Sequence, residues 1–171
     1  GGGPEPGKPA AAASPPIVLF SIDTLRADRL GCYGSGRAAS PRIDAFAGEA
    51  VRFDETIAQA PLTAPSHMSI FTSLYPPVHG IENYSPDWPA GELSERLTTL
   101  PEFMRAHGYF TAAVTGGGNV AGQGFERGFD CYHAGFPNSD EEENRARSVS
   151  KVLSALRRGL RQSRKEGKPP F

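Results

Sequence analysis

A continuous apolar run, Pro16–Ile22, is the feature that most constrains the fold of this chain, and it ends directly in Asp23. Short runs rich in β-branched and aromatic residues are typical of strands buried on both faces of a parallel sheet. In open α/β sheets, ligands bind just outside the carboxyl ends of such strands. The run therefore predicts a strand over 16–22 that places the Asp23 carboxylate at a ligand-binding edge. The simpler interpretation is that Asp23 only begins a turn or caps the next helix.

A second feature is a hydroxyl residue, Thr63, at the start of an apolar helix. Apolar side chains recur at helical spacing after Pro65: they are Met68, Ile70, Phe71 and Leu74. With Pro65 in the first turn, this spacing predicts a helix over 65–74 with one buried face. Thr63 then lies at or just before the helix N-terminus, where the helix dipole favours a bound anion and an ionised hydroxyl. A metal ion held by Asp23 would lower the pKa of that hydroxyl further, so we expect Asp23 and the Thr63 hydroxyl to lie close enough to share one metal ion. The alternative is that Thr63 is an ordinary N-cap.

The chain resembles the N-terminal part of the sulfatase family, within the alkaline phosphatase superfamily. The resemblance runs in unbroken order from about Pro16 to Asp130 and rests on five segments: Ile17–Gly34, Ser40–Phe53, Thr63–Gly80, Thr99–Ala112 and Gly124–Asp130. It implies an α/β fold with a mostly parallel sheet between helical layers, of which this chain is the N-terminal portion. We expect residues 1–15 to be a disordered Gly/Pro/Ala linker and residues 16–171 to be a partial sulfatase-like domain.

The resemblance also implies roles for individual residues. Asp23 falls on a metal ligand, and Thr63 falls where sulfatases carry the cysteine or serine that becomes formylglycine. Here the motif reads Thr63-Ala64-Pro65-Ser66-His67. Threonine cannot be oxidised to that aldehyde, so Thr63 resembles instead the metal-bound nucleophile of the superfamily's phosphodiesterases and transferases. His67 replaces the arginine that steadies the nucleophile and its anion, and we expect it to offer a weaker form of that contact. The implied cofactor is a divalent metal ion such as Ca, Mn or Zn.

Other positions near the motif receive expectations of their own. Asn83 is expected to donate to a substrate oxygen, and His79 to hold the turn after the nucleophile helix. Ser66 is a substitute nucleophile, although it lies one helical turn from the expected place. The stretch Val114–Val120 lacks the Lys-x-His that binds sulfate in many sulfatases. A glycine-rich active-site loop is expected there, and its weak match to a dinucleotide fingerprint is the alternative.

These observations predict a metal-dependent hydrolase or transferase that acts on small anionic phosphate or sulfate esters through Thr63. The alternative is a non-catalytic module on the same fold that binds an anion or a partner protein. The family's later metal ligands have no counterpart here, so we expect the C-terminal part of the domain to supply them and this segment alone to be inactive. With 18 Lys and Arg against 19 Asp and Glu, the charge gives no reason to invoke nucleic acid.

Composition and periodicity complete the expected organisation. The segment Gly1–Ser14 has no apolar run, which fits a linker behind an export signal or membrane anchor and a periplasmic, cell-envelope or secreted location. Cys32 and Cys131 are too few for a disulfide framework and are expected to be unpaired. Regular elements are expected as helices over 42–50 and 100–107, an extended 51–57, a strand over 109–115, and a helix after Asp140 whose basic end offers membrane or calmodulin-like binding as an alternative role.

Overall fold

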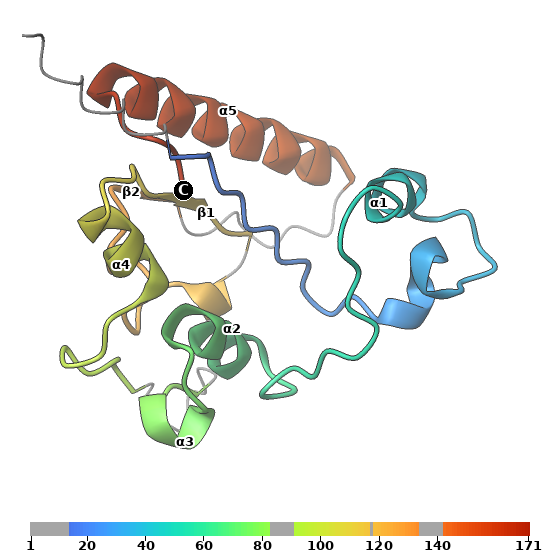
Figure 1. Ribbon diagram of the computed structural model, residues 1–171, viewed down its shortest axis with the longest axis horizontal. Helices are drawn as coiled ribbons and strands as arrows, with labels where there is room; N and C mark the ends of the chain where they lie inside the picture. The colour runs from blue at the N-terminus through green and yellow to red at the C-terminus, as the bar shows by residue number, and fades with distance from the viewer. Residues whose placement is uncertain (1–13, 83–90, 117, 134–141) are drawn as a thin grey trace, which may run out of the picture. The chain divides into compact units, whose positions relative to one another are not determined.

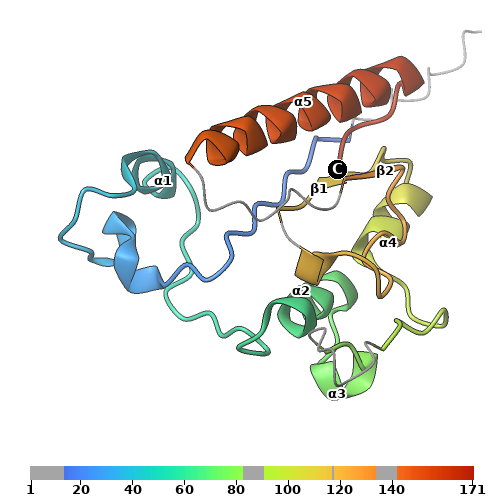
Figure 2. The same cartoon turned by 180° about the vertical axis from the view of Figure 1, so that it is seen from behind.

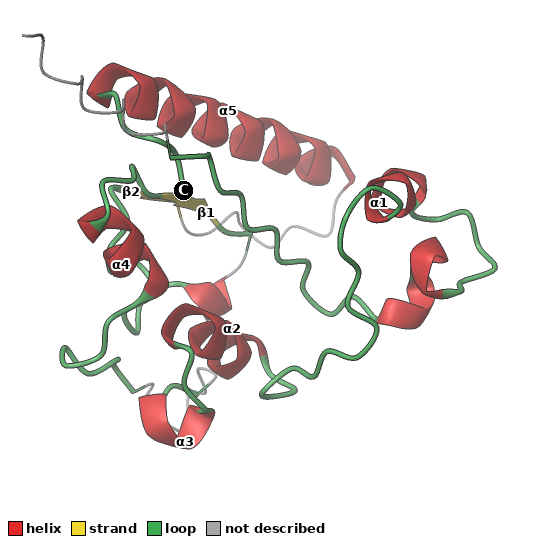
Figure 3. Ribbon diagram, viewed as in Figure 1, coloured by secondary structure: helices red, strands yellow, loops and turns green. Residues whose placement is uncertain are grey.

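The structure is a computed structural model, and it describes residues 14–82, 91–116, 118–133 and 142–171. The chain divides into two compact units. One unit is Phe20–Ser94, and the other combines residues 14–19 with Glu95–Phe171. Figure 3 shows that helices and loops make up most of the described chain, with strand at two short segments.

In the unit Phe20–Ser94, two 3-10 turns, η1 (Ala27–Arg29) and η2 (Gly31–Tyr33), precede helix α1 (Pro41–Ala47). The Asp44 carboxylate ties α1 to η2, because it accepts hydrogen bonds from the Cys32 amide at 2.8 Å and from the Ser40 hydroxyl at 3.0 Å. A side chain on Gly31 would lie 2.3 Å from that carboxylate, so glycine is needed at this close approach. Polar contacts therefore fix this corner.

Helix α2 (Thr63–Thr72) and the short helix α3 (Pro76–His79) pack together in the same unit (Figures 1 and 2). The α2 residues Ala64, Pro65, Met68 and Ser69 are buried. Ser73 and Gly80 end the two helices in the left-handed conformation, with φ of 57° and 71°. The helix predicted over 65–74 is confirmed, with both ends two residues earlier, and Thr63 lies at its N-terminus as expected.

The other unit contains a small parallel sheet. Strands β1 (Ala112–Val114) and β2 (Cys131–His133) pair in parallel, with Ala112 opposite Cys131. Backbone bonds extend this ladder on the other side of β1. The Phe110 amide donates to Pro169 O at 2.9 Å, and the Ala112 amide donates to Phe171 O at 2.8 Å. Among the described residues, the expected parallel pairing is therefore observed in a sheet of two strands.

Two helices accompany this sheet. Helix α4 (Leu100–Ala106) begins at a capping box, in which Thr99 and Glu102 satisfy each other's backbone amides. Helix α5 (Glu142–Glu166) lies across the sheet in Figure 1 and contacts β1. Small residues allow the close approach, since a methyl group on Gly159 would lie 3.2 Å from Cβ of Ala112.

A polar cluster joins the loop before β2 to β1 and α4. Thr111 is completely buried, and its hydroxyl donates to Gly128 O at 2.6 Å. The Asp130 carboxylate accepts from the Thr111 amide at 3.0 Å. Arg127 donates to both carboxylate oxygens of Glu102, at 3.1 and 3.2 Å. This cluster fixes the turn at Gly128–Asp130, at the end of the segment Gly124–Asp130 on which the family resemblance partly rests.

The predicted strand over 16–22 is wrong: these residues have no strand structure. A strand needs hydrogen bonds to a neighbouring strand along its length. Among the described residues, residues 16–22 have one such backbone bond to another segment, in which the Ile17 amide donates to Pro170 O at 3.1 Å. Val18 and Phe20 are accordingly 73% and 82% exposed. The segment 51–57 is likewise without regular structure. The strand expected over 109–115 is shorter, and the helices expected over 42–50 and 100–107 are confirmed within three residues.

Candidate functional site

Asp23 and Thr63, the residues predicted to form a site, both lie in the unit Phe20–Ser94. The apolar run ends in a turn at Asp23–Thr24, and the Thr63 hydroxyl donates to Asp23 Oδ1 at 3.2 Å. A shared metal ion requires the two oxygens to lie within roughly 3–4.5 Å of each other. The prediction that they lie close together is confirmed, although the turn, and not a sheet edge, brings Asp23 there.

The backbone of the turn is strained at one residue. Thr24 has φ of 56°, in the left-handed region that β-branched residues rarely adopt. Such strain persists where the surrounding structure imposes it, and it is concentrated at functional sites. The conformation of Thr24 therefore marks the turn that positions the Asp23 carboxylate.

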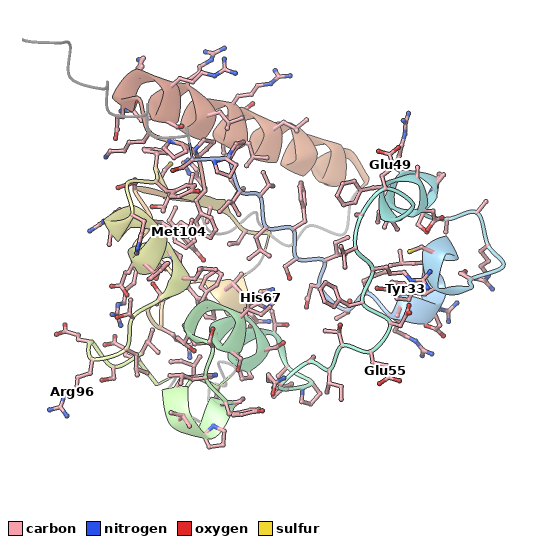
Figure 4. The ribbon with its side chains drawn as sticks, in the orientation of Figure 1. Tyr33, Glu49, Glu55, His67, Arg96 and Met104 are labelled. Atoms are coloured by element: carbon pink, nitrogen blue, oxygen red, sulfur yellow. The ribbon has the colours of Figure 1, made fainter. Side chains whose placement is uncertain are left out.

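Helix α2 supplies the other half of the site. Thr63 is its first residue and is half-buried, so its hydroxyl lies at the positive end of the helix dipole. One turn later, His67 Nδ1 lies 2.8 Å from Thr63 O. A carbonyl oxygen only accepts hydrogen bonds, so Nδ1 carries a hydrogen and donates to it. Figure 4 shows the His67 side chain on α2.

The other nitrogen of His67 contacts a residue that the sequence analysis missed. Nε2 lies 2.7 Å from the Ser21 hydroxyl. Both ring nitrogens of His67 thus contact protein atoms, and its expected role as a weaker replacement for arginine stays a prediction. A signal for Ser21 was present: in an extended segment, residues two apart face the same side, so Ser21 accompanies Asp23.

His79 has the structural role that was expected of it. It is buried, its Nδ1 accepts the Ile81 amide at 3.0 Å, and its Nε2 lies 3.1 Å from the Ser69 hydroxyl. Because Nδ1 accepts, the imidazole is neutral in this arrangement. Burial lowers the pKa of His79 below its usual value of 6.5, and a hydrogen bond with the Pro65 backbone opposes that shift. His79 thus joins α2 to the end of α3.

The remaining expected residues can be placed as follows. Asn83 lies outside the described residues, so its role stays a prediction. Ser66, the substitute nucleophile, is in the first turn of α2. The Asp23 carboxylate contacts the hydroxyl of Thr63. Cys32 and Cys131 are both free, as expected.

The metal-binding capacity of the site follows from its donors. Asp23 and Thr63 offer hard oxygen ligands, which suit Ca²⁺ or Mn²⁺ better than a soft metal. In the part of the chain that the structure describes, no three or more His, Cys, Asp or Glu side chains gather into a metal cage. The two oxygens therefore fit one side of a metal site. The described helices also include none with the length and apolarity of a membrane span.

Comparison with known proteins places this geometry in context. The profile of the family described as Sulfatase matches residues 15–155. Human arylsulfatase D is 34% identical over 135 residues, which are 74% of this chain and 22% of that protein. Mouse iduronate 2-sulfatase is 31% identical over 138 residues, or 75% of this chain and 23% of the relative. Mouse steryl-sulfatase is 32% identical over 117 residues, covering 65% and 19% respectively. The chain thus spans about a fifth of the length of these relatives.

Proposed function

Because the chain belongs to the sulfatase family, we propose that it carries the nucleophile half of an active site that cleaves or transfers sulfuric or phosphoric esters. The observation that carries this proposal is the 3.2 Å contact between Thr63 Oγ1 and Asp23 Oδ1 at the N-terminus of α2. The family relationship also supports an alkaline-phosphatase-like fold, with a parallel sheet wider than the ladder described above.

In the proposed reaction, the Thr63 hydroxyl loses its proton to solvent and its oxygen attacks the phosphorus or sulfur atom. The bond to the ester oxygen breaks, and that oxygen leaves with its alkyl or aryl group and takes up a proton from water. A divalent ion, when bound, would polarise the ester and stabilise the ionised hydroxyl. Asp23 would hold that ion. Without the ion, the Asp23 carboxylate accepts the hydrogen bond from the Thr63 hydroxyl. Water, or an acceptor alcohol in a transferase, then releases the group from Thr63.

Direct attack by threonine favours phosphoric diesters as substrates. The named relatives are sulfatases, whereas residue 63 here is a threonine, which cannot give the aldehyde of formylglycine. We propose that the N-terminus of α2 and the metal ion hold the phosphate or sulfate group of the ester, and that Asn83 donates a further hydrogen bond to it. An extracytoplasmic location is part of this proposal.

The experiment compares the 171-residue chain with the full product of its gene, on an aryl phosphodiester and an aryl sulfate, with Mn²⁺, Zn²⁺ or Ca²⁺. Thr63→Ala is expected to abolish turnover by removing the nucleophile, and Thr63→Ser to retain it. Asp23→Asn is expected to weaken metal affinity, so that excess metal partly restores the rate. Full activity in Thr63→Ala would refute the mechanism, and Ser66 would then be substituted.

The same measurements address a non-catalytic binding module. Tight binding of inorganic phosphate or sulfate without turnover by the full gene product would support it.

A further inference from the structure

We propose that Cys131 and His133 form a reactive thiol–imidazole pair, at which the protein is modified by thiol–disulfide exchange with small organic disulfides. Both residues are on β2, in the unit that does not contain Thr63 and Asp23. The inference is therefore independent of the ester chemistry proposed above. It starts from one contact, in which Cys131 Sγ lies 3.4 Å from His133 Nε2.

The backbone of β2 places the two side chains together. Residues two apart in a strand face the same side of a sheet, so the thiol and the imidazole share one face. The parallel ladder holds both residues: the Cys131 amide donates to Thr111 O at 3.1 Å, and His133 O accepts from the Thr115 amide at 2.9 Å. The two partners are therefore positioned by the backbone.

The imidazole can serve as the base for the thiol. The reactive form of a cysteine is its thiolate, and a neighbouring histidine activates the sulfur by accepting its proton. When Nε2 of His133 is bare, the Cys131 S–H donates to it, and proton transfer along this hydrogen bond gives a thiolate beside an imidazolium. Both residues are half-buried and so keep contact with solvent, from which a small reagent approaches.

A metal site is the other chemistry that cysteine and histidine share. Structural zinc sites use four protein ligands, and catalytic zinc sites use three. Among the described residues, no third His, Cys, Asp or Glu side chain joins this pair. The geometry therefore favours covalent chemistry at the sulfur.

The second cysteine of the chain has a different partner. Cys32 is also half-buried, but its thiol contacts the Asp44 carboxylate. Hydrogen bonds from the Cys32 amide, the Ser40 hydroxyl and the Cys32 thiol hold the pKa of Asp44 below its usual value, although desolvation opposes them. An ionised carboxylate is a weak base for a thiol proton, and it repels a thiolate beside it. Cys32 is therefore an internal reference for Cys131.

The exchange balances in atoms and electrons. The Cys131 sulfur attacks one sulfur of a disulfide R–S–S–R, and the new S–S bond forms as the original one breaks. The other half leaves as R–S⁻ and takes the proton that His133 accepted from the thiol. Cys131 is thus oxidised to a mixed disulfide, and one half of the reagent is reduced to the thiol R–SH.

The test measures modification at each cysteine in the full gene product. The folded protein is treated with hydroxyethyl disulfide at neutral pH and quenched with acid, and peptide mass spectrometry quantifies the mixed disulfide at Cys131 and at Cys32. Cys131 is expected to react about 10–10²-fold faster, up to the lower end of the range for general base catalysis. In concentrated urea the two rates should converge, because the contact with His133 is lost.

Substitution of the histidine identifies the base. His133→Gln should slow the reaction of Cys131 by about 10–10²-fold and leave Cys32 unchanged, since an amide does not take up the thiol proton. His107→Gln changes an exposed histidine of the same unit, so it is the matched control and should change neither rate. In His133→Ala, added imidazole should partly restore the rate at Cys131, which a merely structural role of His133 would not allow.

Two outcomes would overturn the inference: equal rates at both cysteines in the folded protein, or an unchanged Cys131 rate in His133→Gln. The first needs no variant, so it decides the question even if His133→Gln unfolds, which a faster reaction at Cys32 would reveal. Neither outcome changes Thr63-dependent turnover, so failure of this inference and failure of the proposed function are distinguishable.

Discussion

Two threonine–aspartate pairs in this molecule have the same chemistry and the same separation, but their threonines differ in burial. Thr63 Oγ1 lies 3.2 Å from Asp23 Oδ1, and Thr111 Oγ1 lies 3.2 Å from Asp130 Oδ2. Thr111 is completely buried, whereas Thr63 is half-buried; Asp23 and Asp130 are both exposed. A buried polar group must be fully hydrogen-bonded, while an exposed one can exchange its partner for water or a ligand. The buried Thr111 hydroxyl therefore suits a structural role, and the more accessible Thr63 hydroxyl suits a chemical one.

The largest expected effect comes from the glycine whose carbonyl Thr111 contacts. Gly128 has φ of +83°, and a Cβ there would lie 2.2 Å from the Glu102 backbone nitrogen. Gly128→Ala should destabilise the protein by about 2–5 kcal/mol, through the left-handed backbone and the overlap with neighbouring atoms. Urea unfolding followed by circular dichroism measures this.

The matched control is Gly122→Ala. Gly122 has φ of +68°, and an added Cβ meets no atom within 4 Å. It should lose only about 1–2 kcal/mol from backbone strain. Equal losses in the two variants would show that the close approach at Gly128 is unimportant.

The next largest loss of stability is expected from replacing the buried Thr111, and the same replacement at Thr63 should cost less. Thr111→Val leaves Gly128 O and the Asp130 amide without their hydroxyl partner in a buried place, which should cost about 1–3 kcal/mol. Thr63→Val removes a hydroxyl from a half-buried helix start and should cost less than about 1 kcal/mol, while turnover disappears. Melting curves and ester assays of both variants together check the contrast. If Thr63→Val unfolds the protein as strongly as Thr111→Val, the distinction between the two pairs fails.

The sequence predicted the parts of the molecule that local chemistry determines. Pro65 and the apolar spacing located α2, and the resemblance to the family motif brought Asp23 to Thr63. The strand over 16–22 failed because a strand depends on neighbours elsewhere in the chain, which its own residues do not specify. Ser21 was missed because its partner, His67, lies 46 residues away along the chain. Strand β2 is three residues long, too short to show alternation.

A smaller effect should follow the pH. Burial holds the pKa of His79 below the 6.5 of an unfolded chain. As pH falls below 6.5, the unfolded chain therefore takes up a proton that the folded protein does not, and the free energy of unfolding decreases until the folded pKa is reached. Urea unfolding between pH 7.5 and pH 5.5, values on either side of about 6.5, should show this loss.

His79→Gln should remove this part of the pH dependence, because the amide oxygen can still accept the Ile81 amide but does not titrate. His107→Gln changes an exposed histidine and should preserve the dependence. Stability that rises as the pH falls through this range would contradict the neutral state assigned to His79.

The smallest expected change in stability is at the strained turn. Thr24→Gly should relieve the left-handed strain of about 1–2 kcal/mol but lose about 0.5–1 kcal/mol to chain entropy, for a net change between zero and a gain of roughly 1.5 kcal/mol. Thr24→Ala keeps a Cβ and should show no such gain. Because the turn positions Asp23, the glycine variant should also bind Mn²⁺ more weakly, measured by calorimetry on the full gene product. In that case the strain at Thr24 lowers stability but places the Asp23 carboxylate. At Gly128, where the backbone only needs to pack closely, glycine avoids such strain. A clear loss of stability in Thr24→Gly would show that the turn is not strained, and the site would then be as relaxed as the Thr111–Asp130 pair.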